Sequence, residues 1–468
     1  MKYLVLMIFI AANSIAGVYK VGPGLDYTKP SQVASLVADG DTVDISAGVY
    51  EKDVCIWRKN NLLLRGIGGR AHLKCGGLYA EGKAIWVIKG KNTTVENIEF
   101  SEAVVPDKNG AGIRQEGDNL TARNCYFHHC EMGILTGASL KSDIYLLHCE
   151  FSYNGYGDGY SHNIYIGNIN SFTMMFCYSH HSKIGHNVKS RANNNYILYN
   201  RITDGMDGES SMNIDLPNGG ASYIIGNLIM QGPPSENSAM VTYGQEGLKN
   251  PDNRLYVVNN TFVNKKDRAR FIVIKDGTTE AKVINNIFTG SDAETAKIVE
   301  GTAMIQANVQ KNNIADMHFV DEANYDYSIS FESPALDAGI DPGSSSDGNH
   351  LFPLYEYVHP LDSVTRKFNE SIDAGAYEYK PPTKVDNEPE LTENNYLVIN
   401  GKHIKLLLPG NAIIKGIKVF NYIGEEHSIL YSNAAASSRV IESILPAGVY
   451  FIVIETEGRA YYQKVCID

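Results

Sequence analysis

Short runs of alternating apolar and polar residues recur along the middle of the chain, as in YIIGNLIM (223–230) and LYVVNNTFV (255–263). Alternation with a period of two is the pattern of β-strands, and the Gly and Asn residues between the runs favour turns. The pattern therefore predicts many short strands and few helices.

A four-residue word recurs through these strands. It reads NIEF, NCYF, HCEF, FCYS, YNRI, GNLI, NNTF and NNIF, starting at residues 97, 124, 148, 176, 199, 226, 259 and 285, so successive copies lie 23 to 33 residues apart. A repeat of this length is typical of a solenoid, in which each coil buries its apolar face against its neighbours. We therefore predict a right-handed parallel β-helix whose like residues stack about 4.8 Å apart.

The second letter of the word changes along the chain from cysteine to asparagine. We expect these side chains to form one inward column, in which thiols stack and buried amides hydrogen-bond to one another. The column consists of Ile98, Cys125, Cys149, Cys177, Asn200, Asn227, Asn260 and Asn286. The seven cysteines form no CxxC pair, so we predict neither a disulfide scaffold nor a zinc site.

Both ends of the repeat have distinct sequences. Residues 1–16 (MKYLVLMIFIAANSIA) combine Lys2 with an apolar run and small residues, which predicts a secretory signal peptide. The segment SQVASLV (31–37) resembles the short helix that caps many exported β-helix proteins. The segments PALDAGID (334–341) and IDAGAYEY (372–379) resemble the closing part of the same superfamily, so we assign residues 17–380 to the β-helix.

A second module follows the β-helix. Residues 381–395 are rich in Pro and charge and predict a linker, and the alternating strands of residues 396–468 predict a small β-sandwich. The elements IKVFNYIGEE and LPAGVYFIVI resemble the C-terminal sorting domains of type IX secretion in Bacteroidetes. The resemblance implies a protein that is secreted or held at the cell surface, peripheral to the outer membrane at most.

A net charge of −12 argues against nucleic acid as a partner, because phosphates require a basic surface. It does not exclude an acidic substrate, since a local basic patch can act within a negative protein. We expect a monomer.

One group of strands carries charged residues. Aligning GILTG (133–137), HNIYIG (162–167), HNVKSR (186–191), MNIDLP (212–217) and MVTYG (240–244) places Ile134, Ile164, Val188, Ile214 and Val241 in one inward ladder. Alternation then predicts that the residues on either side face outward. These are Asn163, Tyr165, Asn187, Lys189, Arg191, Asn213 and Asp215.

The turns beside these strands add titratable groups, and four histidines fall within residues 162–186. Such a concentration of side chains favours a functional site over surface decoration. The additional candidates are Asp158, Tyr160, His162, His180, His181, His186, Glu209, Tyr243 and Glu246.

The residue types suit an acidic sugar, because Arg can bind a carboxylate through two hydrogen bonds and Asn can bind hydroxyls. In β-elimination from a uronic acid, a base removes the proton beside the carboxylate while positive charge stabilises the anion. We assign Lys189 as the base, Arg191 as the carboxylate ligand, and Tyr165, His162 or His186 as the proton donor. The expected substrate-binding residues are Asn163, Asn187, Asn213, Asp215, Tyr160, His181, Tyr243 and Glu246.

No cofactor is required by this scheme. If a cation takes part we expect Ca²⁺, with Asp158, Glu209 or Asp215 as ligands.

Residues 17–380, with DGYSHNIYIG, GHNVKSRA, IDLPNGG and YGQEG, resemble the right-handed β-helix superfamily of pectate lyases and the chondroitinase B/alginate lyase family. The resemblance is strongest to a group of exported bacterial β-helix proteins. It implies a secreted carbohydrate-active protein, and most directly a polysaccharide lyase acting on an anionic glycan. Lys189 and Arg191 lie two residues apart, whereas the latter lyase family takes its base and arginine from different coils.

Two alternatives stay open from the residues. A glycoside hydrolase of the same fold would use paired carboxylates such as Asp215 with Glu209 or Glu246. A noncatalytic surface protein would bind the glycan without cleaving it.

Overall fold

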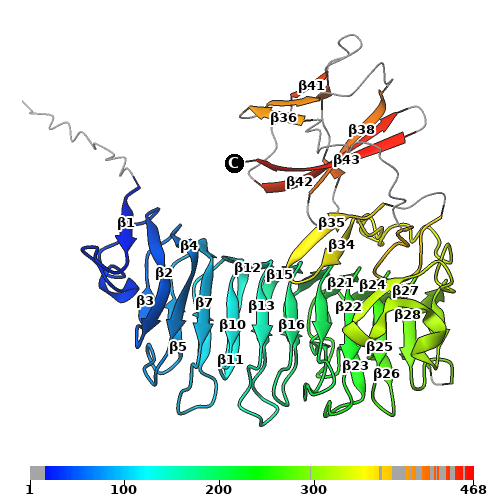
Figure 1. Cartoon of the computed structure of the whole chain (residues 1–468), viewed down its shortest axis with the longest axis horizontal. Helices are drawn as coiled ribbons and strands as arrows, with labels where there is room; N and C mark the ends of the chain where they lie inside the picture. The colour runs from blue at the N-terminus through cyan, green and yellow to red at the C-terminus, as the bar shows by residue number, and fades with distance from the viewer. Residues whose placement is uncertain are drawn as a thin grey trace, which may run out of the picture.

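The computed structural model describes residues 16–295, 297–367 and 371–381, together with strands between residues 397 and 467. The main body is a stack of coils whose strands run parallel, each pairing with the strand one coil before and one coil after (Figure 1). The parallel β-helix predicted from the repeat is therefore confirmed.

Each coil has three faces, which we call the first, second and third face in chain order. The first face is formed by β6 (Thr93–Glu96), β9 (Leu120–Arg123), β12 (Ser139–Leu147), β15 (Ile169–Met175), β18 (Asn194–Leu198), β21 (Ala221–Ile225), β24 (Arg254–Val258), β27 (Glu280–Ile284) and β30 (Met304–Gln306). The second face is formed by β7 (Ile98–Ser101), β10 (Tyr126–His128), β13 (Glu150–Ser152), β16 (Tyr178–His180), β19 (Arg201–Thr203), β22 (Leu228–Gln231), β25 (Thr261–Asn264), β28 (Ile287–Gly290) and β31 (Val309–Lys311).

The third face is a separate ten-stranded sheet. It consists of β3 (Cys55–Trp57), β5 (Ala84–Ile88), β8 (Ala111–Gln115), β11 (Met132–Thr136), β14 (Ile164–Ile166), β17 (Val188–Ser190), β20 (Ile214–Leu216), β23 (Ala239–Tyr243), β26 (Arg270–Ile274) and β29 (Val299–Glu300). At the N-terminal end β1 (Val18–Val21), β2 (Thr42–Glu51) and β4 (Leu63–Lys74) lead into the stack, and β4 pairs with both β6 and β7.

The repeated four-residue word marks the corner between the first and second faces. Its first residue has positive φ in every copy, with values from 49° to 67°. One residue in the left-handed region turns the chain without a loop, and Asn and Gly adopt that region at least cost. This geometry explains why Asn or Gly begins five of the eight words.

The second residue of the word forms the predicted inward column. The Cys149 backbone N–H donates to Cys177 Sγ at 3.3 Å, and the Asn200 side chain donates to Asn227 Oδ1 at 3.0 Å. The same bond repeats from Asn227 to Asn260 at 2.9 Å and from Asn260 to Asn286 at 3.0 Å. Within the described residues the column is therefore structural, as its composition predicts.

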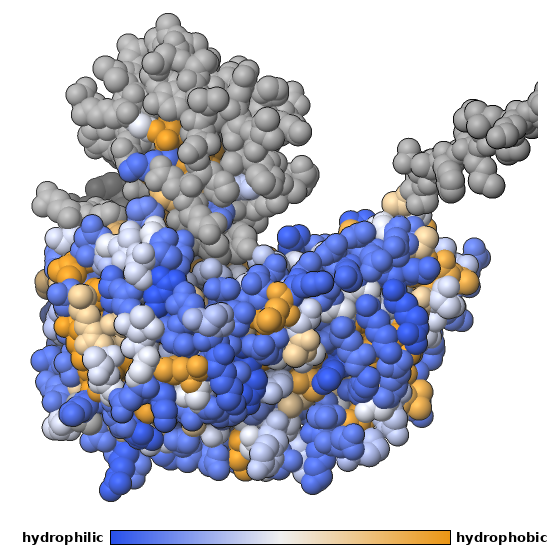
Figure 2. Space-filling model, turned by 180° about the vertical axis from the view of Figure 1, so that it is seen from behind, coloured by the Kyte–Doolittle hydropathy of each residue, from blue (hydrophilic) through white to orange (hydrophobic). Residues whose placement is uncertain are grey.

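The core is filled by the fourth residue of each word and by the inward residues of the third face. Phe100, Phe127 and Phe151 stack on successive coils with centroids 5.0 and 4.8 Å apart. The five residues predicted as the inward ladder of the third face are all fully buried, and adjacent members pair in register. Outside, hydrophilic residues cover most of the coloured surface in Figure 2, with apolar residues in scattered patches.

The N-terminal end is closed by one 3₁₀ turn, η1 (Pro30–Gln32), where we predict a short helix. Val33 and Val37, which follow it, are buried in the same apolar core as the first coils. The predicted signal peptide lies almost wholly outside the described residues.

After β31 the chain folds back along the coils, and we call this part of the chain the return segment. This segment holds η2 (Ile314–Met317), β32 (Phe319–Asp321), η3 (Glu322–Asn324), β33 (Asp326–Ile329), β34 (Tyr355–Val358) and β35 (Asp362–Thr365). Tyr327 packs with Leu228, Met230 and Val263, so the segment covers the outer side of later coils. The two predicted closing segments lie together, since the Gly339 N–H donates to the Ile372 carbonyl at 2.9 Å.

The C-terminal strands form two four-stranded sheets, which agrees with the predicted β-sandwich. One contains β36 (Leu397–Asn400), β37 (His403–Leu406), β41 (Arg439–Glu442) and β40 (Leu430–Tyr431), and the other β39 (Glu426–His427), β38 (Ile414–Asn421), β42 (Gly448–Thr456) and β43 (Arg459–Ile467). The predicted linker falls almost entirely outside the described residues. Among the described residues no helix has the length and apolar character needed to span a membrane.

Candidate functional site

The predicted charged column lies on the outer side of the third face. Tyr165 of β14, Lys189 of β17 and Asp215 of β20 are register partners on three successive coils. Neighbouring parallel strands lie about 4.8 Å apart, so these side chains are adjacent. We call this group, together with Arg191 and Glu246, the third-face cluster.

Lys189 is held between two carboxylates. Its Nζ lies 3.0 Å from Asp215 Oδ2 and 3.5 Å from Glu246 Oε1, and its side chain is only 11 % exposed. Asp215 is the deeper partner, 6 % exposed, and its Oδ1 accepts a hydrogen bond from Thr242 Oγ1 at 2.6 Å. Asp215 is therefore fixed within the sheet.

Arg191 follows β17 and connects three neighbours. Its Nε donates to Tyr165 Oη at 2.9 Å, its Nη1 to Asn218 Oδ1 at 2.8 Å and its Nη2 to Glu246 Oε1 at 2.9 Å. Burial opposes the charged form of Arg191, but the hydrogen bonds to Glu246 and Tyr165 outweigh it and raise its pKa. Arg191 is thus a fixed cation.

Glu246 differs from Asp215 in its exposure. It lies on the turn after β23 and its side chain is 46 % exposed. The hydrogen bond from Arg191 lowers the pKa of Glu246, and the charge of Lys189 contributes in the same direction. Its carboxylate is therefore an anion held at the surface by two cations.

His162 and His186 lie behind the column and are buried. Their rings stack with centroids 4.6 Å apart, and the His186 backbone N–H donates to His162 Nδ1 at 3.0 Å. Burial lowers the pKa of His186 to about 4, although nearby Asp215 acts in the opposite direction. His186 Nε2 lies 3.5 Å from Asp215 Oδ2, and burial likewise holds the pKa of His162 well below its usual range.

The predicted outward placement of Asn163, Asn187 and Asn213 is wrong, because all three are buried. Asn163 Nδ2 donates to Asn187 Oδ1 at 3.0 Å, and Asn213 donates to the Met230 carbonyl at 2.9 Å. Each asparagine precedes its strand and lies in the turn, where strand alternation does not apply. These amides satisfy the interior of the coil and cannot reach a substrate.

The placement of Tyr243 beside the substrate is also wrong. Tyr243 is fully buried, pairs in register with Leu216, and donates its hydroxyl to the Gly220 carbonyl at 2.8 Å. Because Val241 faces inward, a residue two positions later on the same strand faces inward too.

The other candidates do not converge on Lys189. Tyr160 is 83 % exposed, and its backbone N–H donates to Asp158 Oδ1 in a local turn. His181 follows β16 of the second face, where its Nε2 lies 3.0 Å from Asp207 Oδ1. Glu209 is exposed, and within the described residues neither Asp158 nor Glu209 belongs to a group of three metal-donor side chains.

The sequence does not predict two residues that hold the third-face cluster in place, Asn218 and Thr242. Asn218 supports Arg191 from the turn after β20, and no repeat position marks it. Thr242 could have been found, because it occupies the same register position as Asp215 one coil later.

No protein-family model and no curated protein sequence matches the chain. Its structure is similar to that of pectate lyase Pel9A, with a TM-score of 0.50 and 12 % identity over 78 % of this chain and 97 % of that one. A mutant pectin methylesterase in complex with a hexasaccharide matches at a TM-score of 0.28 and 12 % identity, over 49 % of this chain and 79 % of that one, which is too low to support an argument. The first likeness concerns the fold, and it confirms the right-handed β-helix.

Proposed function

We propose that this chain is a carbohydrate-active β-helix protein that binds the carboxylate of a uronic acid-containing glycan at Arg191 and cleaves the glycan by β-elimination with Lys189 as the base. The observation that supports this most is the position of Glu246. Its carboxylate contacts Arg191 at 2.8 Å and Lys189 at 3.5 Å, on the outer side of the third face.

Glu246 shows that the Arg191 guanidinium can bind a carboxylate at this place. A substrate carboxylate has the same charge and shape as the Glu246 side chain, and the planar guanidinium of Arg191 suits it. Because Glu246 lies on a turn and is half exposed, it can leave without disturbing β17 or β20. The substrate would therefore displace an internal carboxylate.

The elimination step uses three side chains. Lys189 in its neutral form takes the proton from the carbon beside the carboxylate, and the released electron pair forms a carbon–carbon double bond as the glycosidic C–O bond breaks. Arg191 holds the carboxylate and stabilises the negative charge that develops there. Tyr165 gives its proton to the leaving oxygen.

Tyr165 fits the role of proton donor because its oxygen already accepts a hydrogen bond from Arg191 Nε, which leaves the hydroxyl hydrogen free to donate. His162 and His186 are buried behind the column, so we assign them as positioning residues. His186 acts through Asp215, which in turn fixes Lys189.

The test is ultraviolet absorbance from unsaturated uronic ends, measured on polygalacturonate, alginate and chondroitin sulfate. On a cleaved polymer, Lys189→Ala should lower kcat by roughly 10²–10⁴-fold, the usual contribution of a general base. Lys183→Ala is the matched control, because Lys183 is an exposed lysine on the turn before β17.

Three results would contradict the proposal. Full activity of Lys189→Ala would remove the assigned base. New reducing ends without absorbance would indicate hydrolysis by Asp215 and Glu246, and binding without any product would indicate a glycan-binding protein.

A further inference from the structure

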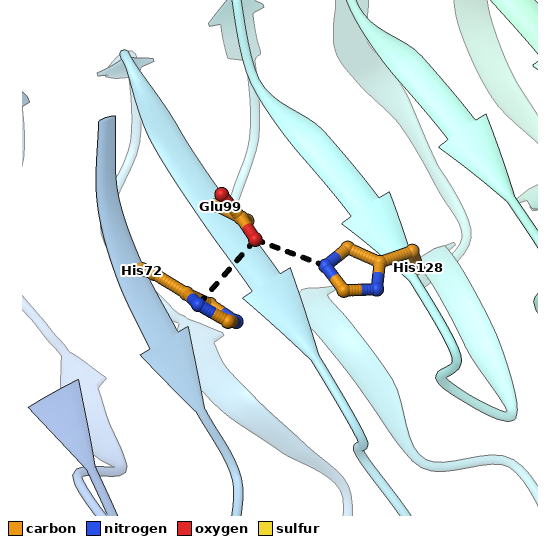
Figure 3. A group of neighbouring side chains, drawn as sticks. All are labelled: His72, Glu99 and His128. Atoms are coloured by element: carbon orange, nitrogen blue, oxygen red, sulfur yellow. Dashed lines mark hydrogen bonds and ion pairs between the residues drawn. The ribbon is translucent and has the colours of Figure 1, made fainter. Parts of the chain in front are cut away.

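Away from the third-face cluster, three side chains with metal-donor atoms converge on the outer side of the second face. They are His72 of β4, Glu99 of β7 and His128 of β10, and Figure 3 shows the two imidazoles directed at the carboxylate between them. One donor atom from each lies within 4.8 Å of the others. We call these residues the second-face triad.

The strands place this triad without any loop. His72 and Glu99 are register partners, and both lie between buried neighbours, so strand alternation turns them outward. His128 lies one coil further, two residues beyond the register partner of Glu99, and its ring stacks on Tyr126 at 4.4 Å. Three successive coils therefore contribute one side chain each.

The two separations from Glu99 fit a small tetrahedral ion. His72 Nδ1 lies 3.4 Å and His128 Nε2 lies 3.1 Å from Glu99 Oε1. Zinc bonds of 2.0–2.2 Å in a tetrahedral arrangement place neighbouring ligand atoms about 3.4 Å apart. The side chains are 16–24 % exposed, so solvent can reach the group and fill a fourth position.

Both imidazoles are oriented by a partner on the opposite side of the ring. His72 Nε2 lies 2.7 Å from Ser101 Oγ, and His128 Nδ1 lies 2.8 Å from His129 Nδ1. Such partners fix the ring and its tautomer, so that a lone pair of the other nitrogen is free for a metal. The potential competitor Lys74 pairs with Glu102 at 3.4 Å instead.

A related group two coils further along lacks the third donor. His180 Nε2 lies 3.4 Å from Glu150 Oε1, and His180 contacts His181 as His128 contacts His129. The register partner that precedes Glu150 is Tyr126, where Glu99 has His72. The Glu150–His180 pair is therefore an internal control for metal binding, because it lacks a second imidazole.

In the described part of the chain, the return segment leaves the triad uncovered. Its contact at His148, where the Leu361 carbonyl accepts from Nδ1 at 2.7 Å, lies one coil beyond His128, and its contacts with Tyr178 and Arg201 lie further along the second face. We propose that the second-face triad binds a divalent transition-metal ion of the zinc class, which links the first coils of the β-helix and keeps one coordination position open. Two imidazoles and one carboxylate suit Zn²⁺ rather than Ca²⁺, which prefers oxygen ligands.

The test is calorimetric titration of ZnCl₂ into the full chain after treatment with chelator. We expect one tight site in the wild type, weakened in His72→Ala, His128→Ala and Glu99→Gln by more than the roughly 10–100-fold that loss of an orienting partner costs. Ser101→Ala should weaken binding by about 10- to 100-fold, as expected for a side chain that only orients a ligand. His180→Ala is the matched control and should bind as the wild type does.

A second readout separates lost binding from lost folding. Zn²⁺ should raise the Tm of the wild type and of His180→Ala, but not of His128→Ala, because only an ion that binds the folded state stabilises it. Co²⁺ bound to the triad should show the visible absorption of a tetrahedral site. Equal Zn²⁺ affinity in the wild type and His72→Ala, or equal weakening by His180→Ala, would overturn the proposal, which does not depend on the glycan activity.

Discussion

At the scale of single residues, Glu246 is the side chain whose removal should change the third-face cluster most informatively. Its carboxylate contacts Arg191, the proposed ligand of the substrate carboxylate, and Lys189, the proposed base. Glu246→Gln removes the competing charge while keeping the shape. We expect this variant to bind an anionic oligosaccharide about tenfold more tightly, as measured by calorimetry, because about 1.4 kcal/mol of competition is lost.

The corresponding control is Gln245→Ala, because Gln245 is an exposed neighbour of Glu246 on the same turn. It should leave the affinity unchanged. Weaker binding by Glu246→Gln would instead show that Glu246 itself contacts the glycan.

His186 predicts a pH dependence of stability. Its pKa is about 4 in the folded chain, below the ordinary histidine value of about 6.5. Between these values the unfolded chain binds a proton that the folded chain does not, so stability falls as the pH falls through this window. At about 1.36 kcal/mol per unit, the loss from His186 between about pH 7 and pH 4 is roughly 3 kcal/mol.

The measurement is urea unfolding of the wild type and His186→Gln at about pH 7 and pH 4. The wild type should lose roughly 3 kcal/mol more than the variant over this range, since glutamine does not titrate. Buried His162 contributes in the same direction in both proteins, and because burial is the main cause of its lowered pKa, most of its contribution cancels in the difference. Equal losses would show that His186 is protonated in the folded state.

At the scale of elements, the inward column can be tested at its two chemically different halves. Asn227 Oδ1 accepts from the backbone and side chain of Asn200, and its Nδ2 donates to Ile197 and Asn260. Asn227→Ala leaves several of these buried groups unpaired and should lower the free energy of unfolding by roughly 3 kcal/mol. Cys149→Ala, in the thiol half, should cost about 1 kcal/mol.

Urea unfolding monitored by circular dichroism measures both variants. A comparable loss for the two would mean that the amide ladder adds nothing beyond packing.

The sequence predicts the strands and their register better than it predicts the site or the path of the return segment. The four-letter word predicts the coil length and the inward column, and the alignment of the strands that follow it predicts the pairing of Tyr165 with Lys189, because strand register carries each position to the next coil. Alternation fails where the strand ends, as at Asn187, which lies one residue before β17 and points inward. The second-letter column does not mark the second-face triad, because Glu99 is the third letter of its word, His128 lies two places after the third letter of its own word, and His72 precedes the first word.

At the scale of the whole molecule, the return segment could not be foreseen. Its residues contact strands about a hundred positions earlier, and no local pattern encodes such a path. Tyr327, for example, lies 1 % exposed against Met230, Leu228 and Val263. The segment thereby covers apolar side chains that point away from the core of the β-helix.

This contact predicts how the segment can be detached. Tyr327→Ala should destabilise the segment by about 3–4 kcal/mol, because it removes a large buried aromatic side chain. Limited proteolysis should then cut the chain near residues 312–330 faster than in the wild type, while the coils stay intact. Val320→Ala, at a residue 58 % exposed in the same segment, should not change the cleavage rate.

The single-residue corner between the first and second faces has a consequence for how such a protein can diversify. A corner made of one left-handed residue has no loop that could absorb an extra residue, so an insertion there would disrupt the strand pairing on both adjoining faces. The two corners that border the third face are turns of variable length, and they carry Asp158, Glu209 and Glu246. New specificities can therefore arise by lengthening those turns while the strands beneath them stay unchanged. The corner between the first and second faces would keep its length, and the two corners beside the third face could vary.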